Sequence, residues 1–283
     1  MEEADRRWID SMPEAYEGGL VATVFRPFAK DLAQRAARLG PQRVLELAAG
    51  TGVLTLEVLG MLPSADVVAT DLNEPMVALG ELHAPGALWR TADAMDLPFQ
   101  DAAFDLVLCQ FGVMFFPDKP AALSEVRRVL VAGGSCLLNV WGALAAHDFQ
   151  AAVVAACDRL FPHSPPSFMR SVPHYYANVD TLVADIEAAG LRVVEVEQLV
   201  LESPQASAVD IAVGYCFGTP LRSEIEARGG DFDSVVGAIA SEIEGHLGGG
   251  TVTGRMQAYV VRSSTRLSTD GFVSPVTVDV ETD

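Results

Sequence analysis

Four residues between positions 46 and 71 have the types and spacing of a nucleotide-binding site. Gly50 and Gly52 form a small-residue turn after a short apolar run, and glycines let the backbone approach a ligand closely. Asp71 ends the next apolar run, where a carboxylate can accept hydrogen bonds from both ribose hydroxyls. Glu46 lies inside the first run, just before the turn. The pattern predicts a strand, a glycine turn, a helix and a second strand, which make half of a doubly wound nucleotide site.

The same turn argues against a dinucleotide. The G-x-G-x-x-G fingerprint would require glycine where Ala48 and Val53 stand, and its third glycine is absent. An acid at position 46 would repel a pyrophosphate, whereas it suits a cofactor that carries positive charge. An NAD-type oxidoreductase therefore remains only as a less favoured alternative.

Further motifs follow this turn in a consistent order. The first has the form E-x-x-x-G-x-G, residues 92–95 read ADAM and precede Leu-Pro-Phe, residues 104–110 read FDLVLCQ, and residues 123–134 read LSEVRRVLVAGG. Over residues 43–141 this sequence resembles the class I S-adenosylmethionine (SAM) methyltransferases. Within that family it resembles the small-molecule branch that includes the ubiquinone/menaquinone-type C-methyltransferases.

The resemblance implies an α/β fold with a doubly wound, mostly parallel seven-stranded sheet of the Rossmann-like methyltransferase type, and SAM as cofactor. In such a site Glu46 would anchor the methionine ammonium, Asp71 would bind the ribose, and Asp93 would lie near the adenine amine. Simpler roles remain open: Glu46 as a buried acid paired with a base such as Arg43, and Asp71 as a helix cap. The positions expected to bind the cofactor are Glu46, Ala48, Gly50, Gly52, Asp71, Leu72, Met76, Asp93, Ala94, Met95, Gln110 and Phe111.

Methyl transfer from a sulfonium needs a water-poor site that holds the nucleophile close, and needs a base only if the acceptor must lose a proton. His147 is the first candidate base, because it follows the strand that borders the methyl group in the family; a solvated histidine at a helix start is the alternative. His174, beside two tyrosines, is a second candidate for the acceptor pocket. The residues expected to line that pocket are Tyr16, Phe115, Trp141 and Phe149. No carboxylate and histidine pattern has metal-ligand spacing, so no metal is expected.

The elements that position these residues follow from hydrophobic periodicity and from glycine and proline positions. We expect an N-terminal helical lid at residues 1–40, with an amphipathic helix at 8–16 and a longer one at 21–39 interrupted at Pro27. A SAM-binding domain would span residues 41–263, with a helical cap inserted at about 203–250, followed by a tail at 264–283. Strands are expected at residues 43–47, 67–71, 88–92, 104–111, 135–140, 193–201 and 251–262. Helices are expected from residue 53 and at 74–82, 119–130, 148–160, 181–189, 208–216 and 235–246, with a loop at 161–176.

Composition restricts the partners. The 283 residues carry 38 acidic and 19 basic side chains, a formal charge of −19 that would repel a nucleic-acid backbone. The start of the sequence lacks an apolar core, and there is no run of 18 apolar residues, so we expect a cytoplasmic protein without a membrane span. The four cysteines have no metal spacing and are expected to be buried thiols.

The favoured function is therefore methyl transfer from SAM to a small, largely apolar or aromatic metabolite, of the kind found in secondary metabolism. A protein that binds SAM without catalysis is the alternative from another functional class. The acceptor atom (carbon, nitrogen or oxygen) and the oligomeric state are left open, with a dimer as one option.

Overall fold

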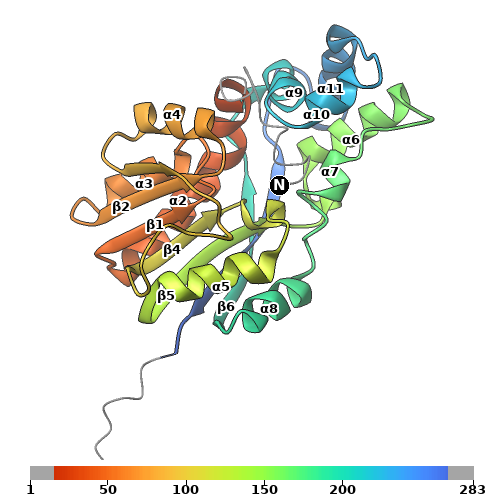
Figure 1. Ribbon diagram of the computed structural model, residues 1–283. Helices are drawn as coiled ribbons and strands as arrows, with labels where there is room; N and C mark the ends of the chain where they lie inside the picture. The colour runs from red at the N-terminus through yellow and green to blue at the C-terminus, as the bar shows by residue number, and fades with distance from the viewer. Residues whose placement is uncertain (1–15, 267–283) are drawn as a thin grey trace, which may run out of the picture.

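Seven strands form a twisted central sheet in the computed structural model, which describes residues 16–266 (Figure 1). In spatial order the strands are β3 (Leu88–Thr91), β2 (Asp66–Asp71), β1 (Arg43–Leu47), β4 (Phe104–Gln110), β5 (Leu130–Trp141), β9 (Arg255–Ser264) and β6 (Arg192–Glu202). The first five run parallel, whereas β9 pairs antiparallel with both β5 and β6. The predicted doubly wound, mostly parallel seven-stranded sheet is confirmed.

Helices cover both faces of this sheet. They are α2 (Arg26–Leu39), α3 (Val53–Met61), α4 (Glu74–His83), α5 (Lys119–Val129) and α8 (Val179–Ala188). Successive strand residues point to opposite faces. In β1, Val44 therefore packs in a cluster with residues of α2 and α3, while Leu45 packs in the cluster that contains residues of α5 and α8. Burial on both faces explains why β1 and β4 are continuous apolar runs in the sequence.

The N-terminal helix differs from the prediction. A π-helical segment, η2 (Glu17–Phe25), continues directly into α2, so the expected interruption at Pro27 is wrong. Pro27 lies in the first turn of α2, where a missing N–H costs little. The Arg26 N–H donates to the Val21 carbonyl, which is the longer hydrogen bond of a π-helix. The expected helix at residues 8–16 lies outside the described residues, apart from Tyr16.

A second group of helices stands beyond the ends of the strands, at the upper right of Figure 1. It contains α6 (Asp148–Leu160), α7 (Phe168–Ser171), α9 (Ala208–Phe217), α10 (Leu221–Glu226) and α11 (Phe232–Leu247). The last three form the insertion between β6 and β9, and its base is closed by the short pair β7 (Ala206–Ser207) and β8 (Thr251–Val252).

Four details of this part of the chain depart from the prediction. Helix α7 forms within the expected loop at residues 161–176, and α10 was not expected at all. Both helices are too short to show a periodic pattern in the sequence, and they pack on each other. The last long strand begins at Arg255 rather than at residue 251. Strand β5 begins at Leu130 rather than at residue 135, and Gly133, with φ +79°, lies inside it. Of the predicted tail, only Ser264 to Arg266 are among the described residues.

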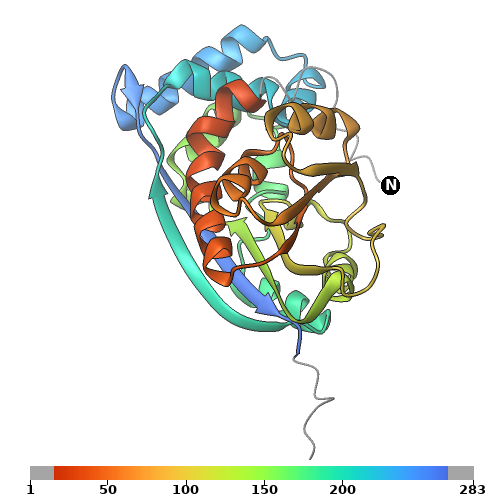
Figure 2. The same cartoon turned by 90° about the vertical axis from the view of Figure 1, so that its left-hand side faces the viewer.

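The N-terminal helix connects the sheet to the second group of helices. Figure 2 shows this helix in front of the sheet, with the second group at its upper end and β6 and β9 curving past it. Segment η2 packs on α9 so closely that a Cβ added at Gly19 would lie 2.4 Å from the Cα of Gly214. A backbone approach of this kind requires a residue without a side chain at both positions.

Within residues 16–266, no helix is long and apolar enough to cross a membrane. The same residues contain no cluster of three potential metal-ligating side chains among His, Cys, Asp and Glu. All four cysteines are buried as free thiols, and each thiol has a pKa raised by burial.

Candidate cofactor and acceptor site

A cavity of about 340 Å³ opens at the carboxyl ends of the parallel strands, between the sheet, the N-terminal helix and the second group of helices. This is where open α/β sheets bind ligands, and the volume is in the range of small-molecule sites. The predicted site residues that line it are Tyr16, Ala48, Gly50, Asp71, Leu72, Met76, Asp93, Ala94, Met95, Gln110, Phe111, Phe115 and Trp141. Glu46, Gly52, His147 and Phe149 are not part of the lining.

At Gly50, the turn after β1 presents backbone atoms and no side chain to the cavity. Ala48, Gly50 and Gly52 all have positive φ, at 51°, 56° and 90°. A Cβ added at Gly50 would meet no atom within 4 Å, so the space beside its backbone is open, and Gly50 lines the cavity. Gly52 instead faces the Trp89 ring and begins α3. The turn can therefore accept a ligand against the backbone at Gly50, while Gly52 permits the close packing behind it.

Asp71 is already oriented by the same turn. Its Oδ2 accepts a hydrogen bond from the Gly50 N–H at 2.9 Å, and its Oδ1 accepts one from the Asn73 N–H at 2.9 Å. Burial raises the pKa of this carboxyl group, and these backbone hydrogen bonds act in the opposite direction. The Asn73 Nδ2 also donates to Oδ1, at 3.3 Å. An ionised carboxylate has about four acceptor sites, so Asp71 keeps one site for a ribose hydroxyl, and rotation of the Asn73 amide would free a second.

Glu46 lies beneath the turn. It accepts a hydrogen bond from the Thr55 hydroxyl at 2.7 Å, and Arg43, the base suggested by the sequence, pairs with Asp105 instead. Burial raises the pKa of Glu46 to about 8, and the nearby charge of Asp71 adds to this effect. The side chain is therefore protonated at neutral pH, and a cation placed near it would favour its ionised form.

The part of the cavity where adenine is expected is shaped by the loop after β3. Asp93 Oδ1 accepts a hydrogen bond from the Met95 N–H at 2.8 Å, and Asp93 forms an isolated β-bridge with Asp96. Leu72 and Met76 line the cavity beside this loop. The result is an apolar slot with a carboxylate at its edge, which suits a purine ring with an exocyclic amine.

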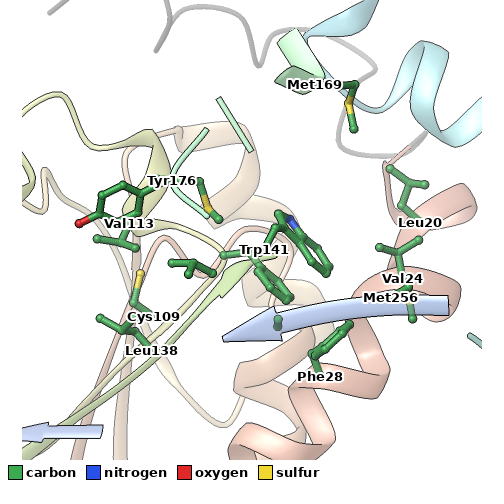
Figure 3. Packing of buried hydrophobic residues seen from close by; sticks show 14 of the residues in the cluster. Leu20, Val24, Phe28, Cys109, Val113, Leu138, Trp141, Met169, Tyr176 and Met256 are labelled. Carbon is green, nitrogen blue, oxygen red and sulfur yellow. The ribbon is translucent and has the colours of Figure 1, made fainter. Parts of the chain in front are cut away.

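An aromatic wall stands at the ends of β4 and β5. The rings of Phe111 and Trp141 are stacked, with centroids 3.5 Å apart and planes 7° from parallel, and Phe28 packs edge-on against both at 5.3 Å. Figure 3 shows Leu20, Val24 and Phe28 of the N-terminal helix beside Trp141, with Met169 of α7 above. Phe111 holds this position at φ +50°, and its N–H donates to Asn139.

The two candidate histidines occupy different places. His147 is fully buried behind the wall, with its ring 5.4 Å from Trp141 and 4.6 Å from His174, and it does not reach the cavity. His174 does line the cavity, and its Nδ1 lies 2.9 Å from the Gly142 carbonyl oxygen. Burial lowers the pKa of His147 to about 3 and that of His174 to about 4, so both are neutral at physiological pH. The geometry thus favours His174 over His147 as a group that contacts a ligand.

Phe149 also belongs to the core rather than to the cavity. It is fully buried, and its ring fills the space that a side chain at Gly254 would need. The sequence pattern assigned it to the pocket because it follows β5, but the side chain points away from the lining.

Comparison with known proteins places the sequence motifs in a family. Residues 45–138 match the sequence model described as a methyltransferase domain. Demethylmenaquinone methyltransferase of Thermus thermophilus is 42% identical over 114 residues, which cover 39% of this chain and 50% of the relative. The chain spans about half the length of the first three of these curated relatives. Demethylmenaquinone methyltransferase of Lactiplantibacillus plantarum is 31% identical over 170 residues, which cover 53% of this chain and 70% of the relative. The chain belongs to the class I SAM-dependent methyltransferases.

The fold of this methyltransferase extends beyond the matched segment. The crystal structure of the YcgJ protein from Bacillus subtilis superposes with a TM-score of 0.52, at 19% identity, over 85% of this chain and 99% of YcgJ. Identity at that level supports a shared fold and nothing more specific.

Three observations show that the cavity of this methyltransferase fits SAM. The turn at Gly50 leaves room for a ligand against the backbone, and Asp71 has a spare acceptor site at the tip of β2. At the end of β4, the Oε1 atom of Gln110 is buried and has no hydrogen-bond partner within residues 16–266. A buried acceptor without a partner is costly, so its place on the cavity lining points to a donor on the ligand.

Sequence reasoning missed most of the residues on the far side of the cavity. They are contributed by the N-terminal helix, α6, α7 and α9, and they are Leu20, Val24, Phe25, Gln150, Phe168, Met169 and Tyr215. Gln150 offered a signal, because it is a polar residue on the apolar face of the predicted helix at 148–160 and is 2% exposed. The others are apolar or aromatic residues whose patterns do not differ from those of an ordinary core.

Proposed function

We propose that this protein transfers the methyl group of SAM to a small, largely apolar or aromatic molecule. The observation that carries this proposal is the two-sided composition of one cavity. The strand ends supply a carboxylate, exposed backbone at Gly50 and an unpartnered amide oxygen, whereas the opposite side supplies aromatic and aliphatic side chains. A nucleoside cofactor and an apolar acceptor can therefore meet inside a single cavity.

On the cofactor side, Asp71 would accept hydrogen bonds from the ribose hydroxyls, and Leu72, Met76 and Asp93 would hold the adenine. Gln110 Oε1 would accept a hydrogen bond from the methionine ammonium. Glu46 does not line the cavity, but its carboxyl group lies under the turn that would bind the methionine part. We propose that Glu46 ionises when the cationic cofactor binds. Its carboxylate would then stabilise the positive charge of the cofactor by electrostatic attraction, without direct contact.

When bound, SAM supplies an electrophilic methyl group on a sulfur that leaves as a neutral thioether. The protein would mainly exclude water and hold the acceptor in line with that methyl group. The stacked pair Phe111 and Trp141 is suited to this task, because it forms a rigid wall where the cofactor side meets the acceptor side. Phe25 and Phe28 support the same wall from the N-terminal helix.

On the acceptor side, the N-terminal helix would act as a lid and the insertion at about 203–250 as a cap. Burying one aromatic ring under them would contribute on the order of 2–3 kcal/mol, which favours apolar acceptors over polar ones by about a hundredfold. The charge of −19 disfavours nucleic acids and other polyanions as acceptors.

Two measurements test this proposal. Calorimetry should show binding of SAM and of S-adenosylhomocysteine (SAH), and no binding of NAD. A screen with SAM labelled in its methyl group should place the label in a small molecule extracted from a metabolite mixture. Tight NAD binding without SAM binding would overturn the proposal, and label recovered in tRNA, DNA or folded protein would overturn its acceptor part alone.

A further inference from the structure

The acceptor side of the cavity contains polar atoms that its apolar lining does not require. Gln150, His174 and Tyr215 line the cavity and are 2%, 8% and 3% exposed. The Gln150 Oε1, the His174 Nε2 and the Tyr215 hydroxyl have no hydrogen-bond partner within residues 16–266. Each such atom costs about 1–3 kcal/mol when it is shielded from water without a partner. Their position on a cavity indicates that a ligand supplies the missing partners.

His174 is the most informative of the three because its tautomer is fixed. The Gly142 carbonyl can only accept a hydrogen bond, so the contact of 2.9 Å requires that His174 Nδ1 carries the proton. Nε2 then carries a lone pair and can only accept a hydrogen bond. Burial keeps the ring neutral at physiological pH, with a pKa of about 4. A neutral imidazole of fixed tautomer thus presents an acceptor atom in need of a donor.

His174 also stands at the place where transfer would occur. Gly142, which holds its Nδ1, directly follows Trp141 at the carboxyl end of β5. That end of β5 lies beside the end of β4, since Asn139 is paired with Gln110 in the sheet. The rings of Trp141, His147 and His174 contact one another in sequence, at centroid distances of 5.4 and 4.6 Å. His174 is therefore linked to the wall formed by Phe111 and Trp141, through the His147 ring and through the Gly142 carbonyl.

Building on the proposed methyl transfer, we propose that the acceptor is a hydroxyl compound, such as a phenol or an enol, and that His174 Nε2 removes its proton. In this step an oxygen lone pair forms a bond to the methyl carbon while the carbon–sulfur bond breaks and its electron pair stays on sulfur. The O–H bond breaks and its proton moves to Nε2. The products are a methyl ether, SAH and a protonated His174, which later releases its proton to water.

The charge balance of this step suits a buried site. One positive charge, on the sulfonium, is present in the cavity before transfer, and one positive charge, on the imidazolium, is present after it. The site therefore never holds an additional net charge, which would be expensive at low dielectric constant. Gln150 and Tyr215 can bind a second polar group of the acceptor, because an amide and a phenol can each donate or accept.

Matched probes can test the need for a hydroxyl group. The SAH-bound protein is titrated by calorimetry with 1-naphthol and with naphthalene, which differ only in that group. We expect 1-naphthol to bind at least about tenfold more tightly, as one satisfied buried acceptor would provide. The preference should disappear in His174→Phe and persist in His163→Phe, since His163 is an exposed histidine of the same segment. Equal binding of the two probes, or no binding of a wider panel of phenols and naphthols, would overturn the proposal.

A second experiment tests the proton transfer itself. His174→Ala should lower single-turnover methyl transfer to a phenolic acceptor by roughly a hundredfold or more, while the SAH dissociation constant changes by less than about threefold. Added imidazole should restore part of the rate, which a purely structural role of His174 would not allow. His174→Gln, which keeps an acceptor atom but cannot take a proton, should bind 1-naphthol and remain slow; it also serves if the alanine variant fails to fold.

The outcomes separate this inference from the proposed function. Mass spectrometry of the labelled product should locate the methyl group on oxygen. If the protein binds SAM and methylates only carbon, or only compounds without a hydroxyl group, the inference is wrong and the proposed methyl transfer stands. If the protein binds neither SAM nor SAH, both are wrong.

Discussion

The two sides of the cavity are built in different ways. On the cofactor side, hydrogen bonds to the backbone order the carboxylate: Asp71 binds the turn at Gly50 and the next loop at Asn73. On the acceptor side, residues from the N-terminal helix, α6, α7 and α9 meet through packing, and several buried polar atoms lack partners. On the first side the carboxylate is ordered without a ligand and one amide oxygen, Gln110 Oε1, lacks a partner within residues 16–266, whereas on the second side the unpartnered atoms come from three different segments. Changes on the two sides should therefore affect cofactor binding and acceptor turnover separately.

Among the variants, Asp71→Ala is expected to have the largest effect, and that effect should fall on cofactor binding. Loss of charge-assisted hydrogen bonds to the ribose should weaken SAM binding by roughly 1.5–3 kcal/mol, about 10- to 150-fold. Calorimetry measures the effect directly. Asp66→Ala, an exposed acid at the opposite end of the same strand, should leave affinity unchanged. An unaltered SAM dissociation constant in Asp71→Ala would show that this carboxylate only orders the turn.

For Gly19→Ala we expect a smaller effect, which should fall on acceptor turnover rather than on SAM binding. The added methyl group would lie 2.4 Å from the Cα of Gly214, so the N-terminal helix and α9 must separate. We expect a loss of roughly 1–2 kcal/mol in unfolding free energy, with methyl transfer reduced more strongly than SAM affinity. Gly18→Ala is the matched control, because a Cβ there meets nothing within 4 Å. Equal losses of turnover in the two variants would refute the role of this contact.

The regions changed in these two variants differ in how well the sequence predicts them. Asp71 and Gly50 follow from local patterns, because a glycine turn between buried strands allows few other structures, and the mostly parallel sheet follows from the family resemblance. The continuous helix through Pro27 was not predictable, since it depends on the packing of η2 against α9. The choice between His147 and His174 was also hidden. It depends on which ring lines the cavity, and His174 reaches it from a segment that follows Gly142 by 32 residues in the sequence.

The pH dependence of the unfolding free energy should reveal the two buried histidines near the acceptor side. The pKa values of His147 and His174 are about 3 and 4 in the folded protein, below the ordinary value of 6.5. The unfolded chain therefore binds protons that the folded protein does not, and unfolding free energy falls as the pH drops from about 6.5 toward 4. His147→Leu should reduce this slope by up to about 1.4 kcal/mol per pH unit. Denaturant titrations at several pH values measure it, with exposed His246→Leu as control; identical slopes in both variants would contradict the assignment.

The smallest effect concerns Glu46. Its pKa of about 8 means that it is protonated at pH 7 in the ligand-free protein, and the positive charges of SAM should lower that pKa. SAM binding at pH 7 should then release up to about one proton, which calorimetry in buffers of different ionisation enthalpy detects. Glu46→Gln should abolish the release, and Glu57→Gln on α3 should not. Proton uptake by the wild-type protein would contradict this account.

The central claim is that one cavity has a cofactor side at the strand ends and an acceptor side under the helices. A crystal structure of the SAH complex tests it most directly. We predict the ribose hydroxyls within hydrogen-bonding distance of Asp71, the adenine between Met76 and Asp93, and the sulfur facing Trp141 and His174. A nucleoside bound among Gln150, Tyr215 and Met169, or SAH outside this cavity, would contradict the account.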